Sequence, residues 1–492
     1  MSSAGGGVTR RQALALGGLE AAALTTGGVV AWQRLGPGSG TSGGGSDLVQ
    51  PMLVTGSGGV VETELVAAPG VTLAGRATRA LGYNGGSPGP TLVVRPGDRL
   101  RLTLRNGLDR PTNLHTHGLH VSPTGRSDDV FRAVSPGESA DYEYEIPDDH
   151  ALGTFWYHPH HHGSVADQVF GGLFGALVVT ADGQPPVEQD TVLLVSDITL
   201  TSGGDVAGVG HMDAMLGREG EQVLVNGLLR PVVTVPSGGT HRWRVVNTCV
   251  SRFLRLRLDG QPFGLLGYDG QALHDPVERD ELLLAPGNRV DVLVRAPQGG
   301  SSSLRALPYD RGGMGGMGGM GGSGAMTGGS DGEEVELATV VAGPVLDGSS
   351  GWVGRATPVE DLRGTAVDTG RTIAMSGGGA GMAMTEFGFD GRTFDPGRVD
   401  QRLRLGTVEE WTVTNPTTMD HPFHLHVWPM QVVAAADLDE SAGPQWRDVV
   451  VVPAGGRVTV RVPVRRFGGR TVYHCHVLDH EDLGMMGVVE AT

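Results

Sequence analysis

Lysine is absent from this chain of 492 residues, so all 37 basic residues are arginines, a bias to which we attach no function. Acidic residues outnumber them, and the net charge of -17 argues against nucleic acid as a partner. Cysteine is almost absent as well: Cys249 and Cys475 are the only two. We expect Cys249 to be a small buried apolar residue. Strong helical periodicity is scarce, which argues against a mainly helical chain.

One stretch near the C-terminus carries unusual chemistry. Cys475 is flanked by His474 and His476, and His480 and Met485 follow it five and ten positions on. A thiolate, two imidazoles and a weak thioether are the ligands of a trigonal copper site that transfers single electrons. In an extended strand, the cysteine side chain points to one face and the two flanking histidines point to the other. A single strand would therefore contact two metal centres.

Histidine pairs elsewhere in the chain would complete these two centres. Three more motifs carry histidine at alternate positions: His115-Thr116-His117, His158-Pro159-His160 and His424-Leu425-His426. With the pair around Cys475 they supply eight imidazoles, enough for a cluster of three copper ions. His421 stands apart from the third pair, and it would join Cys475, His480 and Met485 in a separate mononuclear site.

The second motif is ambiguous, because His160 and His162 also lie two positions apart. Tyr157 precedes His158 as Tyr473 precedes His474, and this alignment favours His158 and His160 as the pair. We expect His162 to lie in a loop.

These motifs resemble, in order and spacing, those of multicopper oxidases of the three-domain laccase type, from about residue 47 to the C-terminus. The resemblance implies four copper ions per chain: one of type 1, one of type 2 and two of type 3. The type 1 ligands would be His421, Cys475 and His480, with Met485 as the axial ligand. The type 2 ligands would be His115 and His424, and the type 3 ligands would be His117, His158, His160, His426, His474 and His476.

The resemblance also implies an activity. A small-molecule reducing substrate would give electrons one at a time to the copper at Cys475, and four electrons would reduce O2 to two waters at the cluster. This reduction consumes protons, so acidic side chains are expected nearby. Glu481 resembles a proton-supplying acid of the family, and so does either Asp128 or Asp129.

The body of the chain predicts an all-β fold. Short Val/Leu/Arg runs alternate with Pro-Gly turns. Two features recur three times, namely a strand that ends in Asn106, Asn247 or Asn415 and a Pro/Gly turn further on. Such internal repeats indicate three similar units. We expect three cupredoxin-like Greek-key β-sandwich domains, at about 47–183, 184–345 and 346–492, of which only the first and third carry the histidine pairs.

Methionine gathers in two glycine-rich stretches, which contain Met314, Met317, Met320 and Met326, and then Met375, Met382 and Met384. Thioethers suit Cu(I), and the stretches resemble inserts of copper-efflux oxidases. Low-complexity expansion of surface loops is the other interpretation. Two substrate classes therefore stay open: phenols and aromatic amines, as in laccases, or Cu(I) oxidised for copper tolerance. A third class, a non-catalytic periplasmic structural relative, would not need the complete ligand set, and a two-domain copper nitrite reductase would not need four histidine pairs.

The N-terminal 46 residues predict export. Arg10 and Arg11 precede a small, apolar run that reaches about Trp32, and this resembles a twin-arginine signal. A flexible Gly/Ser linker follows at 36–46. No clear cleavage site stands out, so an uncleaved membrane anchor remains an alternative. We expect a monomer that is periplasmic, extracellular or anchored to the cell envelope.

Overall fold

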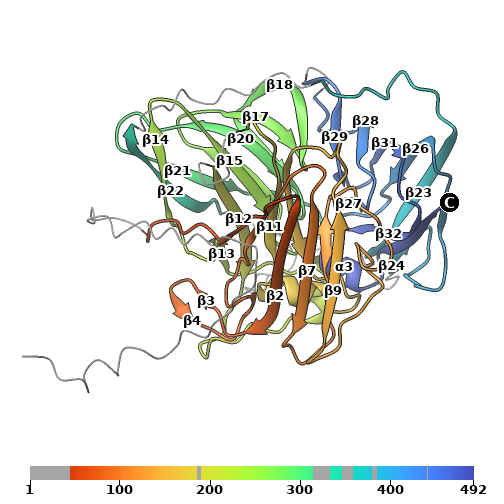
Figure 1. Ribbon diagram of the computed structural model, residues 1–492, viewed down its shortest axis with the longest axis horizontal. Coiled ribbons are helices and arrows are strands. Elements are labelled where there is room, and N and C mark those ends of the chain that lie inside the picture. The colour runs from red at the N-terminus through yellow and green to blue at the C-terminus, as the bar shows by residue number, and fades with distance from the viewer. Residues whose placement is uncertain (1–44, 185–189, 314–332, 346–357, 379–384, 440–441) are drawn as a thin grey trace, which may run out of the picture.

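The computed structural model describes residues 45–184, 190–313, 333–345, 358–378, 385–439 and 442–492. The expected all-β class is confirmed, because strands dominate these ranges and form three sandwiches that follow one another along the chain (Figure 1). No helix in these ranges is long and apolar enough to span a membrane. The proposed export signal and six of the seven clustered methionines, all except Met375, lie outside the described residues.

The first domain packs two sheets, with strand orders β1-β6-β11-β10-β8 and β5-β2-β7-β9, beside a small β3-β4 ribbon. Leu65, Leu102, Tyr142 and Leu177 belong to its buried core. Its elements are β1 (Leu53–Val54), β2 (Val60–Pro69), β3 (Thr72–Leu73), β4 (Arg76–Ala77), β5 (Leu81–Tyr83), β6 (Thr91–Val94), β7 (Arg99–Asn106), β8 (His115–His117), β9 (Ser139–Glu145), β10 (Gly153–His158), α1 (Val165–Gly171) and β11 (Gly175–Val179).

The middle domain packs the sheets β13-β12-β15-β20-β17-β18 and β14-β22-β21-β16-β19. Trp243, Leu256 and Val292 lie in its core. Its elements are β12 (Thr191–Ile198), α2 (His211–Leu216), β13 (Gln222–Val225), β14 (Val232–Ser237), β15 (Thr240–Asn247), β16 (Leu254–Leu258), β17 (Phe263–Tyr268), β18 (Gln271–Arg279), β19 (Glu281–Leu284), β20 (Arg289–Arg295), β21 (Ser301–Leu307) and β22 (Val335–Val345).

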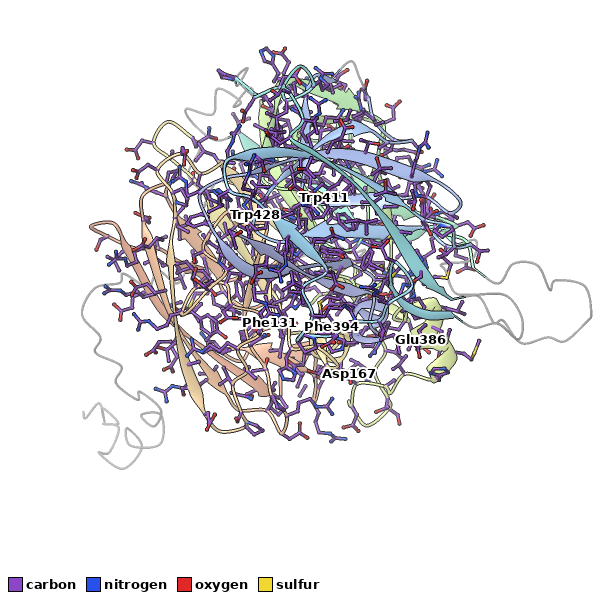
Figure 2. All side chains as sticks on the ribbon, turned by 90° about the vertical axis from the view of Figure 1, so that its right-hand side faces the viewer. Phe131, Asp167, Glu386, Phe394, Trp411 and Trp428 are labelled. Carbon is purple, nitrogen blue, oxygen red and sulfur yellow. The ribbon has the colours of Figure 1, made fainter. Side chains whose placement is uncertain are left out.

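The third domain packs the sheets β24-β23-β26-β31-β28-β29 and β25-β33-β32-β27-β30. Trp411 and Trp428, which Figure 2 labels, lie in its core. Its elements are β23 (Thr369–Gly378), β24 (Thr385–Phe389), β25 (Gln401–Leu403), β26 (Thr407–Thr414), β27 (His421–Leu425), β28 (Met430–Ala434), β29 (Gln445–Arg447), β30 (Val449–Val452), β31 (Arg457–Val464), β32 (Gly469–Cys475), α3 (Leu478–Asp482) and β33 (Met486–Ala491). The exact domain boundaries stay a prediction.

The recurring asparagine has the same structural role in each domain. Asn106, Asn247 and Asn415 are all buried at the ends of β7, β15 and β26. Each side-chain amide donates to two backbone carbonyls, at distances of 2.7–2.9 Å, and each side-chain oxygen accepts the N–H two residues later. The side chain thereby satisfies buried backbone groups where the strand stops. This requirement explains why the asparagine recurs in the sequence.

A further buried cluster joins the domains to one another. It combines Trp156 and Phe170 of the first domain with Leu194 and Val246 of the middle domain and Leu478 of the third. In Figure 1 the orange strands of the first domain lie beside the blue strands of the third, and α3 of the third domain contacts α1 of the first. The histidine pairs of the two outer domains can therefore face one another.

Candidate metal centres

The two outer domains place their histidines on equivalent strands. In the first domain β8 pairs antiparallel with β10, and His115 lies opposite His158. In the third domain β27 pairs antiparallel with β32, and His424 lies opposite His474. The next strand is also equivalent in both sheets, because β10 pairs with β11 as β32 pairs with β33. Equal registers therefore put the pairs at the same place in both domains.

The eight paired histidines converge between these domains in an approximately two-fold arrangement. The rings of His115 and His426 stack with centroids 3.9 Å apart, and the related rings of His117 and His424 also stack at 3.9 Å. The ring centroids of His160 and His474 lie 4.9 Å apart. The two-fold-related rings, those of His158 and His476, lie further apart. The described residues thus bring together all of the following predicted cluster ligands, each buried: His115, His117, His158, His160, His424, His426, His474 and His476.

The ring nitrogens of this cluster have the pattern that metal ions require. Most of the rings use one nitrogen in a hydrogen bond and leave the other without a protein partner. His115 bonds to Asp128 through Nδ1, His158 to the Pro159 carbonyl and His424 to the Asp448 carbonyl, at 2.7–2.8 Å. Their Nε2 atoms are buried and unpaired. A buried polar atom without a partner is costly unless it binds an ion, so these residues fit metal ions.

Three of the Nε2 atoms meet at one point. His474 Nε2 lies 3.2 Å from His160 Nε2 and 3.1 Å from His426 Nε2. Burial lowers the pKa of His160 and of His474 to about 4. The neutral imidazoles that this favours are the form that binds metals. These three residues form one of the histidine groups that could hold an ion.

A second centre lies around Cys475, on the other face of β32. Its Sγ is 3.5 Å from Nδ1 of His421 and 3.8 Å from Nδ1 of His480. Ions that bind nitrogen at about 2.0 Å and sulfur at about 2.3 Å hold such donors roughly 3.5 Å apart. The other ring nitrogen of each histidine, Nε2, has a protein partner: that of His421 contacts Thr417 Oγ1, and that of His480 contacts the Met215 carbonyl. This set of one thiol and two imidazoles therefore fits a single ion.

Met485, the predicted axial ligand, is also fully buried beside this centre. Its backbone carbonyl accepts the N–H of Cys475 at 3.0 Å, which ties the loop after α3 to the end of β32. Cys249 is buried elsewhere, in the middle domain, and both cysteines are free thiols. Thioethers bind weakly at the axial position of such sites, so Met485 lies in a suitable segment for that role.

The two predicted acids touch the histidine cluster from different sides. Asp128 Oδ2 lies 2.8 Å from His115 Nδ1, and its Oδ1 accepts the N–H of Thr116 at 2.8 Å. Glu481 lies 3.1 Å from Nδ1 of His474 and 3.5 Å from Nε2 of His160. Burial raises the pKa of each carboxyl to about 7. Both acids can therefore hold a proton near neutral pH, whereas Asp129 is only half-buried.

The structure places the remaining histidines outside the cluster. His120 lies next to His150, whose Nε2 accepts the His120 backbone N–H at 3.0 Å. His162 is exposed and its ring contacts Phe394. Of the two alternating pairs in this segment, His158 and His160 are therefore the residues that enter the cluster.

Sequence reasoning missed two residues at the cluster. Asp448 Oδ1 lies 3.1 Å from His117 Nε2, and the guanidinium of Arg289 contacts both Asp448 oxygens. Arg289 belongs to the middle domain, which carries no histidine pair. The Pro-Gly turn before Arg289 is recognisable as a repeat marker, but no motif links it to the metal ligands.

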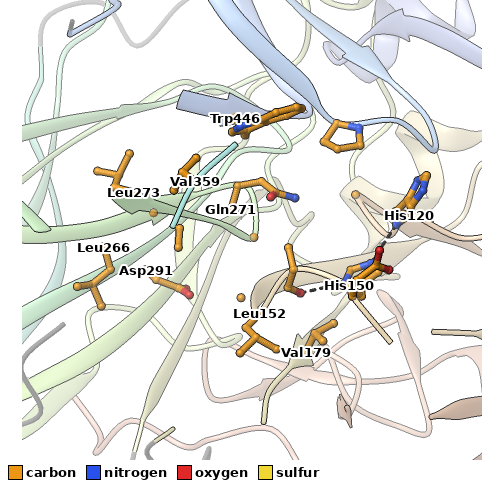
Figure 3. A pocket seen from close by; sticks show the side chains of 18 of the residues that line it. His120, His150, Leu152, Val179, Leu266, Gln271, Leu273, Asp291, Val359 and Trp446 are labelled. Carbon is orange, nitrogen blue, oxygen red and sulfur yellow. Dashed lines mark hydrogen bonds between the residues drawn. The ribbon is translucent and has the colours of Figure 1, made fainter. Parts of the chain in front are cut away.

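A separate cavity of about 570 Å³ lies where the three domains meet (Figure 3). His120 and His150 line one side, and Gln271, Leu273 and Trp446 line the other. Its charged groups are largely paired with each other, as in Arg466–Asp149 and Arg465–Glu360. None of the predicted metal ligands lines this cavity.

Comparisons with known proteins agree with this geometry. Three models of multicopper oxidase domains match residues 66–184, 156–306 and 370–492. A laccase of Bacillus subtilis is 25% identical over 84% of this chain and 90% of its own length. A cell division protein, FtsP of Edwardsiella tarda, is 29% identical over 80% of each chain. The solved multicopper oxidase of Campylobacter jejuni, described as a metallo-oxidase, superposes with a TM-score of 0.78 at 29% identity, over 91% of this chain and 96% of its own.

Proposed function

Because this chain belongs to the multicopper oxidase family and is a copper-dependent oxidoreductase, we propose that it couples the oxidation of a small reducing substrate to the reduction of O2 to water. Four one-electron oxidations and four protons balance each O2. Phenols and aromatic amines are the first substrate class, which the resemblance to laccases implies. The observation that carries the proposal is the burial, in one place, of eight histidines beside a centre of one cysteine and two further histidines.

The ligand roles follow the motifs. Copper supplies the redox chemistry, since it accepts and gives up single electrons. Cys475, His421 and His480, together with Met485, would hold the type 1 ion. His115 and His424 would hold the type 2 ion. The type 3 pair would be held by His117, His158, His160, His426, His474 and His476.

The backbone between the two centres provides the electron path. Cys475 faces the mononuclear centre, and its neighbours His474 and His476 both belong to the cluster. An electron that arrives at the thiolate therefore has a covalent route of one residue to either imidazole. No other pair of described residues joins the two ligand sets so directly, because His421 is separated from His424 by two residues.

Asp128 and Glu481 would supply protons to the reduced oxygen. Each carboxyl contacts a cluster histidine, and each has its pKa raised to about 7 by burial. A positioned acid with a pKa near the working pH is the most effective donor. The two acids contact different histidines, so they would donate protons at different sides of the cluster.

Copper content and O2 uptake together test the proposal. The metal-loaded protein should bind four copper ions, show the blue absorption of a Cys-bound copper, and take up one O2 for every four electrons supplied by a phenol. Fewer than three ions at the histidine cluster, or substrate oxidation that yields peroxide in place of water, would contradict it.

Cu(I) is a second candidate substrate, favoured by what covers the mononuclear centre. His480 is fully buried, and its Nε2 lies 3.2 Å from the Met215 carbonyl in α2. Met215 is half-buried and Met212 on the same helix is 40% exposed. A bulky phenol cannot stack directly on the covered edge of His480, whereas a small ion could bind thioethers nearby.

Deleting residues 314–326 separates the two candidates. This deletion removes four methionines and leaves Gly312 paired with Met419. A fall in Cu(I) oxidation with unchanged phenol oxidation would favour the cuprous substrate. Faster oxidation of bulky phenols with unchanged Cu(I) oxidation would favour the laccase-like substrate. A length-matched Gly/Ser replacement controls for the change in loop length.

A non-catalytic structural role is the third class that the sequence analysis considered, and one relative, FtsP, is described as a cell division protein. The complete set of ten histidines and one cysteine argues against that role, because a structural protein would not need it. Purified protein that bound no copper under any loading condition would favour the structural role.

Export is proposed from the N-terminal sequence alone. Arg10 and Arg11 would direct the folded protein across the membrane by a twin-arginine route. Replacing both with lysine should leave the protein in the cytoplasm, as cell fractionation would measure. Unchanged export of this variant would refute the route.

A further inference from the structure

The middle domain carries no histidine pair, yet one of its turns packs on the histidine cluster. The turn joins β19 to β20 and contains Gly287, whose φ is +87°. A Cβ at Gly287 would lie 2.8–2.9 Å from three ring atoms of His476. Only glycine therefore allows the turn to lie against this ring. The turn ends at Arg289, the first residue of β20.

Arg289 is fully buried and connects all three domains. Its two terminal nitrogens donate to both Asp448 oxygens, at 2.7 and 2.6 Å. Its Nε donates to the carbonyl of Thr154 in the first domain at 3.1 Å. Asp269 of the middle domain accepts the Arg289 backbone N–H at 2.9 Å. The two-pronged contact with Asp448 fixes the carboxylate plane as well as its position.

Asp448 in turn orients two histidines from opposite domains. Its Oδ1 lies 3.1 Å from His117 Nε2, and its carbonyl accepts from His424 Nδ1 at 2.7 Å. The nitrogens left without a protein partner are His117 Nδ1 and His424 Nε2. The hydrogen bond on one nitrogen decides which way the other nitrogen of an imidazole points. Asp448 therefore determines which atoms of His117 and His424 face the cluster.

We propose that Arg289 is a positioning residue of the copper cluster: it holds Asp448 so that His117 and His424 present Nδ1 and Nε2 to the metal. The inference rests on the proposed function, because it takes the cluster to bind copper. It gives the middle domain a part in the site that its sequence motifs do not reveal. Arg289 acts through Asp448 and touches no proposed ligand itself through a hydrogen bond.

Arg244 offers a matched control. It is also a buried arginine of the middle domain, it bonds to Asp190 at 2.9 Å, and it reaches the first domain through Thr154 Oγ1 at 3.0 Å. It contacts no histidine of the cluster in the described structure. Arg289→Lys and Arg244→Lys each keep a positive charge and lose the planar guanidinium, which can donate two parallel hydrogen bonds to one carboxylate. Each variant therefore loses a buried guanidinium that pairs with a carboxylate, and of the two arginines only Arg289 bonds to Asp448.

The experiment compares copper retention and the type 2 electron paramagnetic resonance signal. For Arg289→Lys we expect copper affinity against a competing chelator to fall about 10- to 100-fold, as for lost supports of metal ligands. The type 2 signal should change while the blue absorption stays. Arg244→Lys should keep the wild-type signal and affinity. An unchanged signal in Arg289→Lys, or an equal change in both variants, would overturn the inference.

A double variant covers the case in which Arg289→Lys does not fold. Arg289→Gln with Asp448→Asn replaces the ion pair by two neutral amides that can still bond to each other. It should retain more copper and more of the type 2 signal than Arg289→Gln alone. No recovery would count against positioning. A wild-type protein without a type 2 signal would refute the proposed function itself. That outcome is distinguishable from a failure of the positioning role, in which the wild-type signal is present and Arg289→Lys leaves it unchanged.

Discussion

Cys475 and His474 are neighbours on β32, yet they contact different metal-binding sets. The sulfur of Cys475 lies 3.5 Å from Nδ1 of His421, and Nε2 of His474 lies 3.1 Å from Nε2 of His426. Alternation of side chains along a strand produces this separation. One peptide unit therefore links the site that would accept electrons to the site that would use them.

The first prediction concerns the thiolate. Cys475→Ser should remove the blue absorption, leave the protein one copper ion short, and abolish oxidation of every reducing substrate, because the electron path begins at this sulfur. Absorption spectra, copper analysis and O2 uptake measure the three effects. Cys249→Ser is the control, since that buried cysteine lies in the middle domain, and it should keep colour and activity. Retained turnover in Cys475→Ser would defeat the mechanism.

The second prediction concerns proton supply. Glu481→Gln keeps the shape of the side chain and removes its acid, so turnover should fall by about 100-fold, a typical contribution of a positioned acid. Blue absorption and copper content should stay as in the wild type, because the amide can occupy the same space. Stopped-flow measurement of O2 reduction by the prereduced protein isolates this step. A normal rate would remove Glu481 from the mechanism.

The third prediction tests the close approach of the middle domain. Gly287→Ala places a methyl group against the His476 ring and should lower copper retention. Gly260→Ala is matched to it, because its φ is +82° and no atom lies within 4 Å of the added Cβ. Both variants carry the backbone strain of a left-handed alanine, roughly 1–2 kcal/mol. Copper titration should show a loss in Gly287→Ala alone, and equal retention would contradict the contact.

The fourth prediction concerns a cap shared between domains. Asp482 ends α3 in the third domain and accepts the N–H groups of Gly163, Val165 and Ala166 at 2.7–3.2 Å, at the start of α1 in the first domain. Ser164, the residue at the usual capping position, makes no side-chain cap. Asp482→Ala should therefore destabilise the protein by about 2 kcal/mol.

Calorimetry measures this loss as a lower apparent Tm. Glu386→Ala is the control, because Glu386 is an exposed carboxylate of the same domain, labelled in Figure 2. An unchanged Tm in Asp482→Ala would show that the three N–H groups find other partners.

Much of the fold, and the gathering of the predicted ligands in one place, could be predicted from residue spacing. Histidines two apart on a strand share a face, so the pairs are recognisable as candidate ligands before any contact is known. The repeated Asn106, Asn247 and Asn415 mark three similar domains, because each domain must satisfy the same backbone groups where a strand ends. Local geometry determines both patterns, and local geometry is readable from short stretches of sequence.

The choice between Asp128 and Asp129 could not be made in this way. The two carboxylates are adjacent and both follow the first histidine pair. Only the folded loop shows that Asp128 turns inward to His115, whereas Asp129 stays half-buried and accepts the N–H of Phe131. Packing of that loop decides which neighbour is buried.

The amino-acid sequence by itself determined the donor atoms, the all-β class and the strand that serves two metal-binding sets, since these depend on residue type and on the two-residue period of a strand. Tertiary structure alone decided that Arg289 supports Asp448 and that Met215 covers His480. These partners lie 159 and 265 positions apart. Contacts between residues so far apart in the sequence arise from the way whole domains pack. Short-range sequence patterns do not predict that packing.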